Sequence, residues 1–345
     1  MRGNLNYFDV VMDKFYAGGW FIMQKTLEVS GGSMPTAHLL ADDFQRMLRE
    51  NDYSQSTCAT YLRFVEPFLK ENPHPAEMDR YDVGRYILKW RNQLSNNSMK
   101  LATSALIKFY KYLKFYHGFR RADAVIDHIQ DLKGEFFRTP SFQPDPMSED
   151  ELSTLFQYTL GSNPRQVRRR NIITILLGTG LRVSEFCAVR RDQVITHEPG
   201  VQSHIFVPGG KTASARRKIP LHRDFPYSNS WILGERVVEA FDSYEKVRPV
   251  PRTEEAENFW FISERGQPIS KRSVQAMFTR LCEKSGLQEK RAEADENSLS
   301  VHNLRHTFAT QLAMQGANAY QIKAILGHAS VSTSQAYIRL LDRIG

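Results

Sequence analysis

Apolar side chains in the first third of the chain recur at the spacing of helices. Over residues 36–116 they return every three or four positions, as at Leu40 and Phe44, with polar and charged residues between them. This spacing gathers the apolar residues on one face of each helix. It predicts an all-α bundle over residues 34–138 with basic outer faces. Two of its helices are expected near residues 79–94 and 98–116.

The pattern changes after residue 148. Some runs, such as residues 172–177, keep helical spacing, but short apolar stretches bounded by turn residues follow. Helices are expected again after Trp231, with a polar, charged loop at residues 288–298. The sequence predicts a second domain over residues 148–345, mainly α with a small antiparallel β-sheet. Its strands are expected near residues 192–195, 204–207 and 216–221.

A proline-rich segment separates the two patterns. Three prolines fall within seven residues, which excludes a continuous helix and predicts an extended linker at residues 139–147. Before the first domain, residues 1–33 are rich in aromatic side chains and end in Gly-Gly-Ser. This N-terminal extension could be a docking helix for a partner subunit, an extra helix of the fold, or sequence upstream of a true start at Met34.

Composition favours a polyanionic partner. The chain of 345 residues has a net charge of +8 and a pI near 9.3, and its basic residues form short clusters rather than one tail. Cys58, Cys187 and Cys282 lie far apart, which argues against a disulfide framework or a zinc cage. The sequence has neither a long apolar run nor a signal peptide. We therefore expect a soluble, cytoplasmic protein without membrane contact.

Two segments carry arginines at positions suited to an oxyanion. Arg182 follows a Thr-Gly-Leu turn at the start of a helix, and Glu185 lies one turn further on the same face. His302 and Arg305 are also one helical turn apart, so they can present an acid–base group and a cation to one anion. The spacing of His302 and His306 would also suit zinc, but Arg305 between them would repel a metal ion, so His306 is interpreted as a core or supporting residue.

Two further residues complete the candidate site. Tyr337 follows His328 by nine positions near the C-terminus, and a tyrosine becomes a nucleophile only when cations and a base surround it. Lys211 follows two glycines on the turn between two predicted strands. This Gly-Gly-Lys-Thr segment is no nucleotide-binding P-loop, because Ile205 stands where that motif needs its first glycine. Lys211 remains as a mobile proton donor.

The ordered motifs resemble a known family. Thr-Gly-Leu-Arg-x-x-Glu, a hairpin Gly-Lys, His-x-x-Arg-His, Leu-Gly-His and a following tyrosine are similar to the tyrosine recombinases, the group of phage integrases and Xer-type resolvases. The resemblance implies that residues 34–138 form a SAM-like core-binding domain that contacts double-stranded DNA. It also implies a homotetramer on two DNA sites, and leaves open an accessory protein or a second recombinase. It implies no metal and no other cofactor.

The family's residue roles carry over to matching positions. Arg182 and Arg305 would hold the scissile phosphate, while His302 and His328 would hydrogen-bond to it and assist proton transfer. Tyr337 would attack and form a 3′-phosphotyrosyl bond. Integration, excision and resolution all use this chemistry.

Supporting roles fall to other positions. Lys211 would protonate the leaving 5′ oxygen. Glu185 would support Arg182 without touching the phosphate itself. The hairpin is longer than is usual in the family, which makes Lys218 an alternative acid. Only eight residues follow Tyr337, and the N-terminal extension is a candidate replacement for a longer C-terminal helix in subunit contacts. The rival interpretations are an architectural DNA-binding protein that has lost the reaction and a topoisomerase with the same cleavage chemistry.

Overall fold

The structure is a computed structural model, and it describes residues 37–136, 142–209, 216–221 and 235–344. Contacts divide the chain into two units, Met1–Pro140 and Ser141–Gly345, and each is described by itself. The N-terminal extension and Lys211 lie outside the described residues. Throughout the described ranges, no helix is both long and apolar enough to cross a lipid bilayer.

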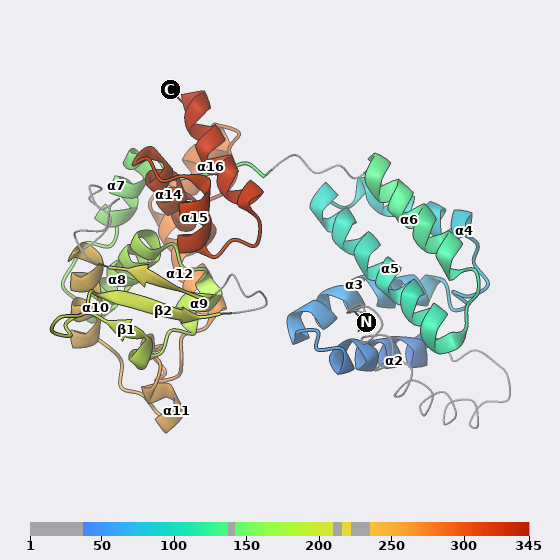
Figure 1. Cartoon of the computed structure of the whole chain (residues 1–345), viewed down its shortest axis with the longest axis horizontal. Helices are drawn as coiled ribbons and strands as arrows, with labels where there is room; N and C mark the ends of the chain where they lie inside the picture. The colour runs from blue at the N-terminus through green and yellow to red at the C-terminus, as the bar shows by residue number, and fades with distance from the viewer. Residues whose placement is uncertain (1–36, 137–141, 210–215, 222–234, 345) are drawn as a thin grey trace, which may run out of the picture. The chain divides into compact units, whose positions relative to one another are not determined.

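The described part of the first unit, residues 37–136, is all α (Figure 1). Its core contains many aromatic rings, with Phe68 meeting Tyr86, Phe109 and Tyr110 edge to face. Such buried ring pairs are favourable beyond the area they bury, so they fix how the helices pack. The expected helical bundle is confirmed. Its elements are α2 (Ala37–Glu50), α3 (Gln55–Glu71), α4 (Arg80–Lys89), η1 (Trp90–Asn92), α5 (Asn96–His117) and α6 (Ala122–Phe136).

The second unit combines helices with one small sheet. The three strands run in the order β1-β2-β3, both pairs antiparallel, with Ile205 opposite Ile219. The expected fold class, mainly α with a small antiparallel sheet, is confirmed. The strands are β1 (Val194–Ile195), β2 (His204–Pro208) and β3 (Arg216–Pro220). The helices are α7 (Glu149–Gln157), α8 (Pro164–Thr179), α9 (Val183–Cys187), η2 (Arg191–Gln193), α10 (Glu235–Lys246), α11 (Glu254–Glu257), α12 (Lys271–Lys284), α13 (Leu287–Glu293), α14 (Val301–Met314), α15 (Ala319–Leu326) and α16 (Val331–Ile344).

The loop expected at residues 288–298 is wrong in its first half, because α13 occupies Leu287–Glu293. Its buried face consists of Leu287 and Arg291, one turn apart. Arg291 is buried because its guanidinium bonds Asp145 at 2.7 Å and Glu151 at 2.6 Å. A charged residue therefore occupies a position that the hydrophobic pattern treats as solvent-facing, and this hides the helix.

The segment that leads into the second unit is fastened to α14. The backbone N–H of Asp145 donates to Nδ1 of His306 at 3.0 Å, and that of Met147 donates to the Thr307 hydroxyl at 2.8 Å. Asn303 donates to both the carbonyl and the carboxylate of Asp145. These bonds hold the incoming chain against the helix that carries His302 and Arg305.

Candidate active site

A glycine turn places Arg182. Helix α8 ends at Gly180, whose φ of 58° lies in the left-handed region, and the side chains of Phe308 and Leu326 leave no room there for a Cβ atom. The chain reverses at this point, and Arg182 becomes the residue that precedes α9. Its side chain is 36% exposed, so an anion from solvent can reach it.

Helix α14 carries the second arginine. The side chain of Ser300 caps this helix, and Arg305 lies further inside it, only 3% exposed. Its guanidinium donates to the carbonyl of Gly180 at 2.5 Å and to that of Leu326 at 2.7 Å. Burial, with the nearby Arg182 charge, lowers the pKa of Arg305 to about 9, which still leaves it protonated at neutral pH.

Three arginines converge on the last carbonyls of α15. Arg182 donates to Gly327 at 2.9 Å, Arg305 to Leu326, and Arg217 of β3 to Ile325 at 2.6 Å. The end of a helix presents carbonyls without helical partners and the negative end of its dipole. The carbonyls at the end of α15 thus hold the three arginines close together and orient them. Acidic side chains would do the same but would also cancel the positive charge.

One carboxylate links two of these arginines. Glu185 accepts from the backbone N–H of Arg182 at 2.8 Å, from the Arg182 guanidinium at 2.9 Å, and from both terminal nitrogens of Arg217 at 3.1 and 2.9 Å. Burial raises the pKa of Glu185, but the hydrogen bonds and charge of Arg217, with Arg182, overcome it and lower the pKa to about 2. The three arginines outnumber this carboxylate, so the cluster keeps a net positive charge.

Sequence reasoning missed Arg217. Its side chain is 4% exposed and points to the same face of β3 as buried Ile219, whereas Lys218 between them is exposed. Strand alternation was the signal that could have found it, because an inward arginine requires a buried acidic partner.

His328 and Tyr337 lie together beyond the end of α15. Their rings are nearly parallel, with an interplanar angle of 9° and centroids 6.1 Å apart. Nδ1 of His328 hydrogen-bonds the Ser334 hydroxyl at 2.9 Å, which fixes the imidazole. Burial and the charges of Arg305 and Arg182 lower the pKa of His328 to about 3, so it is neutral at physiological pH. Partial burial and the same arginines also lower the pKa of His302, which lies solvent-accessible on α14.

Tyr337 is buried in this state. Only 1% of it is exposed, and it packs in a cluster with Phe308, Leu312 and Leu326. The ring of Phe142 covers it, with centroids 5.8 Å apart. Burial raises the pKa of Tyr337 to about 12, although Arg305 and Arg182 lower it in part. The phenol is therefore protonated and shielded from solvent.

His306 contacts the rings of both His302 and Tyr337 and is held by the backbone of the incoming chain. Its ring centroid is 4.8 Å from that of His302 and 6.2 Å from that of Tyr337. Its Nδ1 accepts a hydrogen bond from Asp145, and burial lowers its pKa to about 4. Over the part of the chain that the structure describes, no three histidine, cysteine or acidic side chains group in a way that would hold a metal ion.

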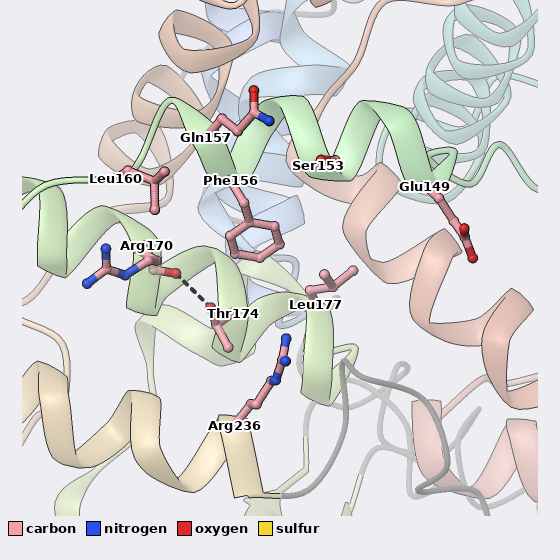
Figure 2. A pocket seen from close by; sticks show the side chains of 9 residues that line it. All are labelled: Glu149, Ser153, Phe156, Gln157, Leu160, Arg170, Thr174, Leu177 and Arg236. Atoms are coloured by element: carbon pink, nitrogen blue, oxygen red, sulfur yellow. Dashed lines mark hydrogen bonds between the residues drawn. The ribbon is translucent and has the colours of Figure 1, made fainter.

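An open cavity adjoins the arginines. It has a volume of about 450 Å³, and its lining includes His302 and Arg305 of α14 with Gln275 and Thr279 of α12. A separate apolar pocket of about 490 Å³ lies between α7, α8 and α10, where Figure 2 shows Phe156. That pocket contains none of the candidate residues.

The structure thus groups seven of the eight predicted site residues in one place. Hydrogen bonds or ring contacts join each of them to at least one other member or to the α15 carbonyls. The seven are Arg182, Glu185, His302, Arg305, His306, His328 and Tyr337. The eighth, Lys211, lies outside the described residues.

Two protein-family models match this chain, one in each unit. Residues 146–343 match the model of the phage integrase family, and residues 40–115 match the phage integrase N-terminal SAM-like domain. Tyrosine recombinase XerC of Lacticaseibacillus casei (strain BL23) is 28% identical over 312 residues, covering 85% of this chain and 91% of that protein.

Solved structures share the fold. The Tn1549 transposon integrase in complex with transposon right end DNA matches with a TM-score of 0.64 and 22% identity, covering 86% of this chain and 94% of that one. A lambda integrase tetramer bound to a Holliday junction matches with a TM-score of 0.63 and 17% identity, covering 90% and 85%. Since the family model matches more than half of the chain, this protein belongs to the phage integrase family, the site-specific DNA recombinases of the tyrosine type.

Proposed function

We propose that this recombinase cleaves and rejoins duplex DNA through a covalent bond between Tyr337 and a 3′ phosphate. The observation that supports this most directly is the cluster at the end of α15, where two arginines, a neutral histidine and a tyrosine lie together. Fixed donors aimed at developing charge stabilise a transition state strongly, because they need no reorganisation during the reaction.

Each side chain then has a defined task. Arg182 and Arg305 bind the non-bridging oxygens of the scissile phosphate, and neutral His302 and His328 hydrogen-bond to it. The Tyr337 phenol gives its proton to a neutral histidine, His302 or His328, and its oxygen attacks phosphorus. The bond to the 5′ oxygen breaks, and that oxygen takes a proton from Lys211 and leaves as a 5′ hydroxyl. A 5′ hydroxyl from another strand reverses the step. One phosphoester replaces another throughout, so the energy of the bond is conserved and the reaction requires neither ATP nor a metal ion.

Lys211 is proposed to protonate the leaving 5′ oxygen, and Lys218 is the alternative. A 5′-phosphorothiolate leaves without a proton, so it rescues a variant that lacks only the acid. We expect Lys211→Ala to cleave ordinary DNA about 10²-fold to 10⁴-fold more slowly than the wild type and to cleave the phosphorothiolate at close to the wild-type rate. If Lys218→Ala is rescued and Lys211→Ala is not, the acid is Lys218.

The proposed partners follow from the substrate. Lambda integrase has been solved as a tetramer bound to a Holliday junction, and we propose a homotetramer on two DNA sites for this chain. The proposal leaves room for an accessory protein or a second recombinase in that assembly. Because the substrate is DNA, we place the protein in the cytoplasm on the nucleoid.

A two-site plasmid assay tests the proposal. Wild-type protein is first incubated with fragments that flank its own gene, and DNA that stays attached after denaturation is sequenced to locate the site. Two copies of that site are then placed in one plasmid. Deletion or inversion of the intervening segment is expected. Relaxation of supercoils without exchange would instead identify a topoisomerase, and tight binding without any adduct would identify an architectural protein.

A further inference from the structure

Arg217 is buried, charged and not assigned to the reaction. It lies on β3, which packs against α15, and its guanidinium spans two parts of the site. Its terminal nitrogens bind both oxygens of Glu185, while its Nε binds the carbonyl of Ile325. Paired, planar contacts of this kind restrict both distance and orientation, which a lysine cannot reproduce.

Both contacts lead to groups that would touch the phosphate. Glu185 also holds the backbone and guanidinium of Arg182, so fixing Glu185 fixes Arg182. Ile325 is followed by Leu326 and Gly327, whose carbonyls bind Arg305 and Arg182, and then by His328. Displacing this end of α15 would shift three groups of the site at once.

We propose that Arg217 is a positioning residue of the recombinase, which acts through Glu185 and the end of α15 to aim Arg182, Arg305 and His328 at the scissile phosphate. This rests on the proposed function. Arg217 touches no DNA in this role, because its side chain is 4% exposed. Its loss should therefore slow cleavage of bound DNA without weakening binding.

Single-turnover cleavage of a nicked suicide substrate at saturating DNA tests this, with DNA affinity measured separately. Loss of a residue that orients the ligands of a metal typically costs about 10-fold to 100-fold. By analogy we expect Arg217→Met to cleave about 10-fold to 100-fold more slowly, with affinity within about threefold. Arg217→Lys should recover part of the rate. Arg216→Met, a neighbour on the opposite, exposed face of β3, is the matched control and should cleave as the wild type does at saturation.

The pH profile separates positioning from a merely structural role. Among the described residues, the charged groups around Glu185 are Arg182 just before α9, Arg217 on β3 and Arg305 on α14. Burial raises the pKa of Glu185, and without Arg217 fewer positive charges lower it again. As the pH falls, Glu185 in Arg217→Met should therefore gain a proton and lose its hold on Arg182. The ratio of the Arg217→Met rate to the wild-type rate should therefore drop toward pH 5. In a Glu185→Gln background the same ratio should stay flat.

The outcomes are distinct. The proposal is overturned if Arg217→Met cleaves at the wild-type rate. It is also overturned if the loss of rate only matches the loss of folded protein, measured by thermal unfolding. Either result leaves the proposed function intact. An equal pH ratio in both backgrounds overturns it as well. A wild-type protein that forms no adduct with the substrate overturns the proposed function and, with it, this role.

Discussion

Tyr337→Phe is expected to form no covalent adduct with a nicked suicide substrate, while the wild type accumulates one. The substitution removes the attacking oxygen and nothing else, because phenylalanine fills the same space in the cluster around Phe308. Loss of one hydroxyl from such a site changes stability by about 1 kcal/mol. DNA binding should therefore match the wild type, and the midpoint of thermal unfolding should shift by no more than about 2–4 °C. The measurement is protein that stays attached to labelled DNA in a denaturing gel.

A second tyrosine serves as the control. Tyr320 lies on α15, next to the site in sequence, but is 73% exposed. Tyr320→Phe should form the adduct at the wild-type rate. An adduct in Tyr337→Phe would show that another residue is the nucleophile, and digestion of that adduct to a peptide would identify it.

Arg305→Met and Arg305→Lys are expected to show the next largest effect on cleavage. One lost donor to a developing oxyanion slows a reaction by about 10²-fold to 10³-fold, or about 2.7–4 kcal/mol. Arg305 presents two terminal nitrogens and a buried positive charge, so we expect Arg305→Met to lose at least about 10³-fold by the same measure. Lysine keeps the charge but cannot bind Gly180, Leu326 and a phosphate together. The cleavage rate of Arg305→Lys should therefore lie between that of Arg305→Met and that of the wild type.

The free energy of unfolding of Arg305→Met tells whether the variant loses rate through the reaction or through the fold. Removing Arg305 leaves two carbonyls without this donor, each at a cost of about 1–3 kcal/mol. Against this, burial lowers the pKa of Arg305, which means that the buried charge itself opposes folding at neutral pH. The net change in the free energy of unfolding should therefore be smaller than the loss in activation free energy. If Arg305→Met is instead largely unfolded at the assay temperature, its loss of rate reports the fold and not the reaction.

The sequence predicted those features that depend only on residues close together in the chain. The helical spacing of His302 and Arg305 and the three short strands need only a few residues of context. The charged helix α13 was missed because Arg291 is buried by acidic residues more than 100 positions away. Arg217 was missed for the same reason, since it looked like one member of a basic cluster.

The burial of Tyr337, the proposed nucleophile, also could not be predicted from the sequence. The motif spacing predicts that Tyr337 lies close to His328, and the structure shows their rings stacked. Nothing in the motif indicates that Phe142 covers the tyrosine or that burial raises its pKa to about 12. If Tyr337 attacks the phosphate, as proposed, DNA binding must first expose it to its substrate.

The end of α15 has a consequence for when the protein becomes active as it is made. Its carbonyls bind arginines that precede them by 145 and 108 positions, so these bonds close some of the longest loops in the second unit. Contacts so distant form late, after local helices and hairpins. Until α15 has been made, these arginines have no carbonyls to gather them. We therefore expect a chain truncated before α15 to bind DNA without cutting it.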